Sequence, residues 1–224
     1  MAISTPTYSA VLNAISRTSV AVSGSGVGLV FVAGDDASDS ITTVTWGGAT
    51  MYKVNTTSVE VPGDRYISVW AIQDPASSAT IEFNDNVENY WRNFNAFYPG
   101  ATLTGGTTVD SQFRGTSAGA AVLSVATTVV ASDCWIITFD KEGTGLAQTY
   151  TPSGVLSSMR AQSDAGGLAI ADSNGTVGTG SQTATLTINS GTPSRGAITF
   201  SLAPAGGAVA PAQVHSNLLT LGVG

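Results

Sequence analysis

The residues best suited to chemistry lie in the stretch Arg114–Val122, which reads RGTSAGAAV. Its segment Gly115–Gly119 matches G-x-S-x-G, the pattern in which a sharp strand-to-helix turn presents a nucleophilic serine. Several aspartates follow, and then His215, the only histidine, so that the order Ser…Asp…His of α/β-hydrolases is present. The pattern raises the hypothesis of a serine hydrolase with Ser117 as its nucleophile.

The elements expected around Ser117 do not fit that turn. Residues 105–115 (GGTTVDSQFRG) are polar and rich in glycine, whereas the motif needs a buried strand there. Residues 120–130 (AAVLSVATTVV) alternate and are β-branched, which favours a strand over the required helix. The base, His215, lies in a terminal segment where a fixed geometry is difficult to hold. We therefore expect a loop leading into a strand at Ser117, and a hydrolase is the remote alternative.

Metal and thiol chemistry have weaker signals. The acidic stretches Asp35–Asp39 and Asn84–Asn89 carry oxygen ligands, but they lack the spacing and the glycine of a calcium loop. We expect both to be solvated turns, and we expect no bound metal or cofactor. The single cysteine, Cys134, lies in the apolar run DCWIITF and is predicted to be a buried small hydrophobe.

Composition limits the classes of partner. The chain has 224 residues and a net charge of −7, with 42% hydrophobic and only 10% charged residues. Its eight basic residues are scattered singly, so we expect no nucleic-acid partner. No apolar run approaches the roughly 18 residues of a membrane span, and the first residues lack the pattern of a signal peptide. We therefore expect a chain made in the cytosol, with no membrane partner.

The periodicity of the sequence is that of β-strands. Two alternating runs joined by Gly47-Gly48 predict a tight hairpin, because glycine accepts the positive φ of such a turn. About a dozen short strands without helical crossovers predict an all-β fold, an antiparallel β-sandwich of jelly-roll-like form. The predicted strands are 29–34, 41–46, 49–54, 65–72, 79–83, 93–100, 121–130, 134–139, 155–162, 167–172, 182–188 and 197–202.

The two ends of the chain differ from its middle in composition. We expect an N-terminal arm at residues 1–16, a β-sandwich domain at 17–203 and a C-terminal arm at 204–224. The arms carry apolar side chains that we expect to contact neighbouring subunits, because such groups are seldom left exposed without a partner. These contact residues are Ile3, Tyr8, Val11, Leu12, Ile15, Val214, Leu218, Leu219 and Leu221.

An aromatic cluster precedes Gly100. Phe94 and Phe97 are expected in the core. Tyr90 and Trp91 either cover a sheet edge or, if exposed, stack on a sugar or anchor a receptor contact.

Several short words of the sequence resemble a known family. They are VTWGGATMYKV (44–54), RYISVWAIQDP (65–75), ATIEF (79–83), NFNAFYPG (93–100) and the closing GAITFSLAPA (196–205). This series is similar to a β-sandwich module that recurs among structural proteins of bacteriophage virions. The match is good over Leu29–Gly100 and only general over Ala121–Ala205. The resemblance implies a part of the virion and brings no catalytic residue with it.

The leading hypothesis is a capsid decoration (cement) protein that stabilises a phage head by bridging neighbouring subunits. It implies no enzymatic activity and a location in the virion after synthesis in the host cytoplasm. The expected partners are the major capsid protein, further copies of the chain, or other virion proteins. The alternative is a tail-associated module that binds carbohydrate or a receptor through Tyr90 and Trp91.

Overall fold

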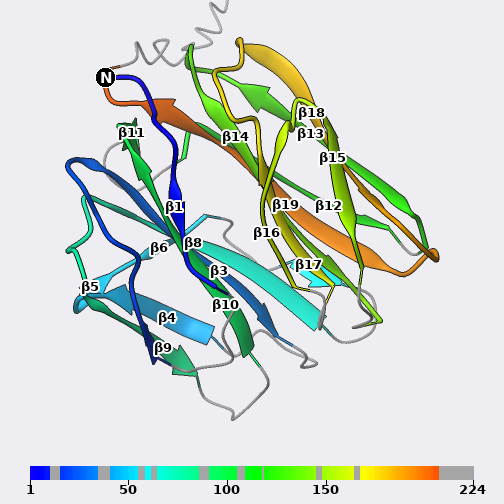
Figure 1. The fold of residues 1–224 in the computed structure, drawn as a ribbon, viewed down its shortest axis with the longest axis horizontal. Helices are drawn as coiled ribbons and strands as arrows, with labels where there is room; N and C mark the ends of the chain where they lie inside the picture. The colour runs from blue at the N-terminus through cyan, green and yellow to red at the C-terminus, as the bar shows by residue number, and fades with distance from the viewer. Residues whose placement is uncertain are drawn as a thin grey trace, which may run out of the picture.

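The computed structural model describes residues 1–10, 16–34, 41–54, 59–61, 65–85, 91–104, 109–117, 119–144, 148–163 and 167–206. Within these ranges every regular element is a β-strand, and every strand pair is antiparallel (Figure 1). The predicted all-β, antiparallel fold class is confirmed. In the described part of the chain no helix is long and apolar enough to cross a membrane.

The first half of the chain forms two sheets. Sheet 1 has the strand order β2 (Ser16–Thr18), β9 (Thr80–Asp85), β4 (Ile41–Trp46) and β5 (Ala49–Thr50). Sheet 2 has the order β1 (Thr7–Tyr8), β10 (Trp91–Pro99), β3 (Gly26–Gly34), β8 (Arg65–Gln73) and β6 (Tyr52–Lys53), with β7 (Val59–Val61) also on β8.

The second half forms two more sheets. Sheet 3 has the order β11 (Ala101–Thr102), β19 (Arg195–Pro204), β14 (Trp135–Glu142), β17 (Leu168–Asp172) and β16 (Ser158–Ser163), with β12 (Ser111–Ser117) also on β19. Sheet 4 has the order β13 (Val122–Val129), β18 (Gly180–Ile188) and β15 (Tyr150–Gly154).

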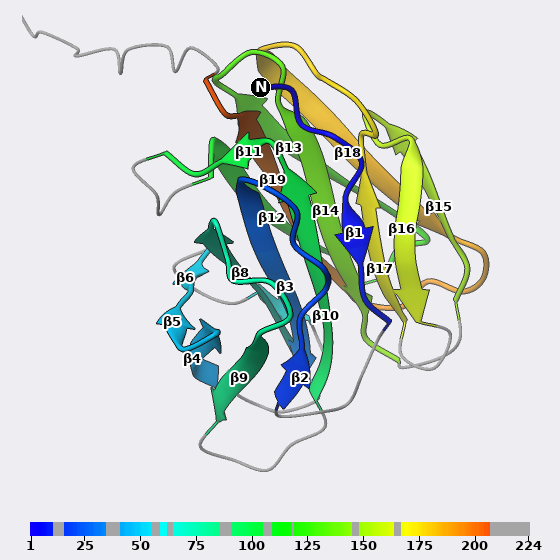
Figure 2. The same cartoon turned by 60° about the vertical axis from the view of Figure 1, so that its left-hand side comes forward.

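The four sheets stack face to face in the order in which they are numbered (Figure 2). Three apolar clusters fill the spaces between successive sheets. Trp46 and Ile81 of sheet 1 pack with Val30 and Val32 of sheet 2. The remaining two clusters join sheet 2 to sheet 3, around Phe31, Phe94, Phe139 and Phe200, and sheet 3 to sheet 4, around Ile136, Ala169, Leu186 and Ile188. The arrangement is sandwich-like, with four layers.

The inner strands are covered on both faces. Every residue of β3, β14, β17 and β19 is buried. Because side chains alternate along a strand, Leu29 and Phe31 of β3 enter the cluster shared with sheet 3, whereas Val30 and Val32 enter the cluster shared with sheet 1. Two buried faces explain why these strands read as nearly continuous apolar runs in the sequence.

The glycine hairpin is confirmed. Gly47 and Gly48 have φ values of +61° and +80°, and β4 pairs with β5 directly across them. The predicted strand at residues 49–54 divides at the buried Met51, because β5 stays in sheet 1 while β6 pairs with β8 in sheet 2. This crossing of the chain ties the first two layers together.

The expected loop before Ser117 is a strand instead. Residues Ser111–Ser117 form β12, which pairs with β19 along its whole length. Polar and glycine-rich residues suit this strand because it pairs with β19 at one edge and much of it is exposed. At Gly115 a Cβ would lie 2.8 Å from Val125 of β13, so the missing side chain lets the two strands approach.

The central cluster predicts where substitutions cost most stability. Phe31 is fully buried, and its ring lies 5.5 Å from that of Phe139 and 6.5 Å from that of Phe200. Phe31→Ala should lower the free energy of unfolding by about 3–5 kcal/mol through lost contacts and the cavity left behind. The matched control, Phe113→Ala, removes a side chain that is 55% exposed and should cost roughly 1 kcal/mol or less. Urea unfolding measures both, and equal losses would contradict the layered core.

Candidate functional site

One buried polar cluster joins sheet 2 to sheet 3, and we name it the Asp172 cluster. The carboxylate of Asp172 is fully buried at the end of β17. Its Oδ2 accepts hydrogen bonds from the Tyr98 hydroxyl at 3.1 Å, the Arg160 Nε at 2.8 Å and the Tyr8 hydroxyl at 3.5 Å. Its Oδ1 accepts from the Asn174 backbone N–H at 2.9 Å. Four donors from four segments of the chain thus converge on one carboxylate.

Strand alternation places these groups. In β17 Asp172 shares a face with Leu168 and Ile170, which pack in the cluster facing sheet 2. In β10 Tyr98 lies on the face that meets sheet 3, and its ring packs edge-on against Trp135 at 6.2 Å. The Tyr98 hydroxyl therefore passes through apolar surroundings to reach the carboxylate. Tyr8, in β1, forms a hydrogen bond with the same hydroxyl at the edge of sheet 2.

Electrostatics keep the two tyrosines protonated. Burial is the main reason that the pKa of Tyr8 and the pKa of Tyr98 both lie well above the ordinary value of 10. The negative charge of Asp172 raises both pKa values further. Both hydroxyls therefore keep their protons: Tyr98 donates to Asp172 at 3.1 Å, and Tyr8 shares its single proton between Tyr98 and Asp172. Arg160 supplies the compensating charge. The cluster holds two sheets in register through hydrogen bonds and one ion pair.

A second cluster joins sheet 3 to sheet 4. Arg195, fully buried at the start of β19, donates to Asp140 of β14 from Nη2 at 3.1 Å and from Nε at 3.3 Å. Its Nη1 donates to the carbonyls of Ala121 and Leu186, both at 2.8 Å. Leu186 belongs to β18, so the guanidinium reaches from one sheet to the next and is satisfied on both.

Tyr150 closes this second cluster from β15. The Arg195 guanidinium lies 5.7 Å from the centre of its ring, and the Tyr150 hydroxyl donates to the carbonyl of Gly167 at 2.6 Å. Burial raises the pKa of Asp140 to about 6, although the charge of Arg195 acts in the opposite direction. The Arg195–Asp140 pair is thus a buried ion pair whose carboxylate lies unusually close to protonation at neutral pH.

Glu142 lies beside the same cluster at the end of β14. The carboxylate is fully buried, and its Oε2 accepts hydrogen bonds from the backbone N–H and the hydroxyl of Thr144. Its Oε1 has no hydrogen-bond partner among the described residues. A Cβ at Gly167 would lie 2.0 Å from the Glu142 side chain, so only glycine leaves room for this carboxylate.

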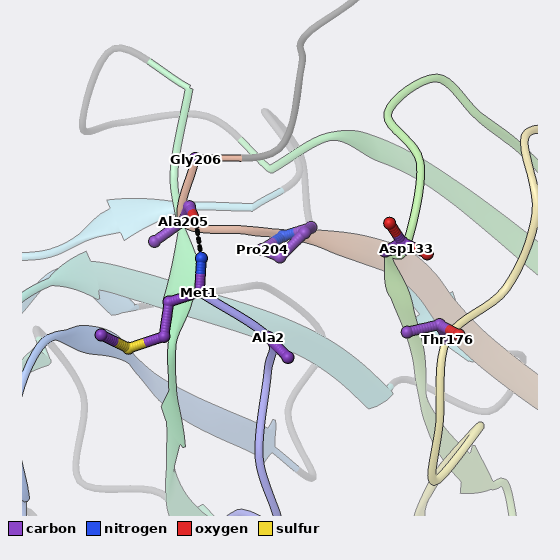
Figure 3. A pocket seen from close by; sticks show the side chains of 7 residues that line it. All are labelled: Met1, Ala2, Asp133, Thr176, Pro204, Ala205 and Gly206. Atoms are coloured by element: carbon purple, nitrogen blue, oxygen red, sulfur yellow. Dashed lines mark hydrogen bonds between the residues drawn. The ribbon is translucent and has the colours of Figure 1, made fainter.

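One open hollow of about 330 Å³ lies where the first residues meet the end of β19 (Figure 3). The Met1 amine donates to the Ala205 carbonyl at its rim. Asp133 is the only charged side chain in its lining, which otherwise consists of Met1, Ala2, Thr176, Pro204, Ala205 and Gly206. The lining holds no paired acid and base, and no nucleophile beside a base.

The structure places two of the predicted arm residues against the chain's own sandwich. Ile3 is 6% exposed and belongs to the central apolar cluster, and Tyr8 packs against the same cluster. The Ser4 backbone N–H donates to the Pro99 carbonyl at 3.0 Å, so this part of the chain follows β10. The other predicted contact residues lie outside the described residues: Val11, Leu12, Ile15, Val214, Leu218, Leu219 and Leu221.

The structure tests part of the prediction for the aromatic cluster before Gly100. Phe94 and Phe97 are fully buried, which confirms the prediction for both. Trp91 is the first residue of β10, and Tyr90 lies outside the described residues. The structure therefore leaves the carbohydrate or receptor hypothesis as a prediction.

The hydrolase motif has a different setting from the one its chemistry needs. Ser117 ends β12 opposite Arg195, and the next described element is the strand β13. The proposed base, His215, lies outside the described residues. Cys134 is fully buried as predicted, and burial raises the pKa of its thiol.

The predicted acidic turns fall mostly outside the described residues. Residues 35–40 and 86–90 are not described, whereas Asn84 and Asp85 end β9. Within the described ranges no three histidine, cysteine, aspartate or glutamate side chains gather as metal ligands.

Sequence comparison adds no relative. No protein-family model matches the chain, and no curated protein matches it.

Sequence reasoning missed both polar clusters. Their charged members lie at the ends of strongly apolar runs, as in LAIAD, WIITFDKE and RGAITFSL. The useful signal is a charge at a position where alternation points inward, because such a group must find its partner inside the protein. Asp172, Asp140 and Arg195 all meet that criterion.

The Asp172 cluster gives a stability prediction. Asp172→Asn removes the charge that pairs with Arg160 and weakens the bonds from two tyrosines, so it should lower the free energy of unfolding by about 1–3 kcal/mol. The control, Asp133→Asn, changes an exposed aspartate and should shift it by less than about 0.5 kcal/mol. Chemical denaturation compares the two, and an unaffected Asp172→Asn protein would show that the cluster does not hold the sheets.

Asp140 gives a pH prediction. Its pKa is about 6 in the folded chain, against an ordinary 3.8, so the folded state keeps a proton that the unfolded state releases. The contribution of Asp140 to stability should therefore fall as the pH rises from about 4 to 6, and stay constant above that window. Carboxyl ¹³C NMR titration measures the pKa directly. A midpoint near 4 would contradict the effect of burial.

Proposed function

We propose that the chain is a structural protein of a phage virion, a capsid decoration protein that stabilises the head by bridging neighbouring subunits. The sequence resemblance to virion β-sandwich modules supports this proposal. Its strongest part, Leu29–Gly100, falls on strands β3 to β10, which build most of sheet 1 and most of sheet 2. The remaining strands add two further layers of the same antiparallel kind.

The observation that carries the proposal is that several charged side chains are buried and paired between the sheets. Asp172 is fully buried and bridges sheet 2 and sheet 3, while the ion pair of Arg195 and Asp140 lies between sheet 3 and sheet 4. Groups of this kind add specificity of arrangement more than stability. Their placement suits a rigid block whose task is to hold a shape against its neighbours.

The mechanism is surface complementarity without a chemical step. A decoration protein of this kind contacts the major capsid protein, further copies of itself, or both, and it needs no cofactor. The chain is made in the host cytoplasm and acts in the virion.

Particle association tests the proposal. A tagged copy of the chain is expressed while the virus that encodes it is propagated, and the particles are separated on a density gradient. We expect the chain to band with DNA-filled heads at a fixed ratio to the major capsid protein. A chain that stays in the soluble fraction contradicts the proposal, and one found only with isolated tails favours the tail-associated alternative.

Particle stability provides the second measurement. Particles assembled without the chain should release their DNA at a lower temperature than complete particles, because the bridging contacts are missing. Adding purified chain back should restore the release temperature. Equal release temperatures with and without the chain would argue against a cementing role.

A further inference from the structure

The outer face of sheet 4 carries no charged side chain. In each of its strands the residues alternate, so that Leu123, Val125 and Leu186 point toward sheet 3 while their neighbours face outward. We name the outward set the neutral face. It consists of Val122, Ser124, Ala126 and Thr128 on β13, Ser181, Thr183, Thr185 and Thr187 on β18, and Thr151 and Ser153 on β15.

The strand register makes the neutral face regular. Val122, Thr187 and Thr151 form one row across the three strands. Ser124 and Thr185 lie opposite each other in the next row, with their hydroxyl oxygens 2.8 Å apart. Exposed protein surfaces usually carry interspersed charges that oppose association with another surface. The neutral face has no such charges. Its most apolar exposed side chain is that of Val122, which is 50% exposed.

Charge is distributed unevenly along the stack of sheets. From Ser173 to Gly224 the only charged residue besides His215 is Arg195, and Arg195 is fully buried. Glu82, which is exposed, belongs to β9 in sheet 1, the outer sheet at the opposite end of the stack. Two copies of a chain with a net charge of −7 repel each other at most orientations. Contact through the neutral face brings no charged side chains together and keeps the two copies of sheet 1 farthest apart.

We propose that the neutral face is the surface through which two copies of this chain pair back to back. The pair has a twofold axis near Thr183, in the middle strand, because the same patch serves both copies. Sheet 4 of one copy then stacks on sheet 4 of the other, which continues the face-to-face stacking already present within each copy. The inference deepens the proposed function, since it rests on a role in assembly and names one contact.

The size of the face sets the strength of the pairing. Strand β13 has eight residues. At about 3.4 Å per residue and about 4.8 Å per strand, the three strands present roughly 400 Å² per copy. A standard interface buries about 800 Å² on each partner. We therefore expect weak pairing in solution and effective pairing where a particle holds many copies close together.

Disulfide trapping tests the contact. Thr183→Cys places an exposed thiol near the axis, while the native Cys134 is fully buried and does not compete. Thr50→Cys is the matched control, since Thr50 is an exposed strand threonine in sheet 1. Under mild oxidation of the full chain we expect disulfide-linked dimers to form at least tenfold faster with Thr183→Cys. Equal rates would overturn the proposal.

A charge-reversal pair tests the symmetry. Thr183→Lys and Thr183→Glu each place like charges together at the axis, so each variant should sediment as a monomer at concentrations where the unmodified chain begins to pair. An equimolar mixture should restore dimers that contain one of each. Variants that pair as the unmodified chain does, or a mixture that stays monomeric, would contradict a contact at Thr183. Thermal unfolding verifies that both variants are folded.

The particle experiment separates this inference from the proposed function. If the chain bands with heads but the Thr183→Cys protein gives no more dimer than the control, the neutral-face contact is wrong and the proposed function stands. If the dimers form but the chain never bands with particles, the contact stands and the proposed function fails.

Discussion

The packing of sheet 2 against sheet 3 is the constraint on which the rest of the structure depends. Phe31, Phe94, Phe139 and Phe200 meet in this layer, and each is fully buried. Because sheet 1 and sheet 4 cover the other faces, the central strands β3, β14, β17 and β19 have no face in contact with water. A polar atom on an inner strand must therefore find its partner inside the protein, or it lowers stability by about 1–3 kcal/mol.

The two polar clusters satisfy that requirement and add specificity. The hydrophobic effect is non-directional, so apolar contacts specify the alignment of two sheets less sharply than hydrogen bonds do. In the observed stacking Asp172 accepts a hydrogen bond from Tyr98 of sheet 2, and Arg195 donates one to the Leu186 carbonyl of sheet 4. A buried ion pair contributes little net stability compared with apolar residues of the same size. Its effect here is to make misaligned stacking of the layers costly.

Sequence alone predicted the strands well and their stacking poorly. Alternation and apolar runs located β3, β8, β14 and β19, and Gly47-Gly48 located the hairpin. The same patterns do not indicate which strands pair with one another. The sequence therefore could not distinguish a fold of four sheets from a sandwich of two. Short strands such as β1 and β2 are extended because they pair with longer neighbouring strands. The polar composition of β12 gave no sign of its pairing with β19. The polar clusters depend on contacts between residues as far apart as Tyr98 and Asp172, which periodicity does not reveal.

The two outer sheets of the stack differ in whether their outward faces carry a charged side chain. The apolar side chains and the paired charges lie mainly between the layers. The outward side chains of the two outer sheets are therefore not constrained by internal packing. Among the described side chains sheet 1 carries one exposed carboxylate, that of Glu82 on β9, whereas the outward positions of sheet 4 are threonine, serine, alanine and valine. Burying an unpaired carboxylate costs far more than burying a hydroxyl, although a covered hydroxyl also needs a hydrogen-bond partner. Covering sheet 4 therefore displaces no charged group, and the proposed pairing depends on that property.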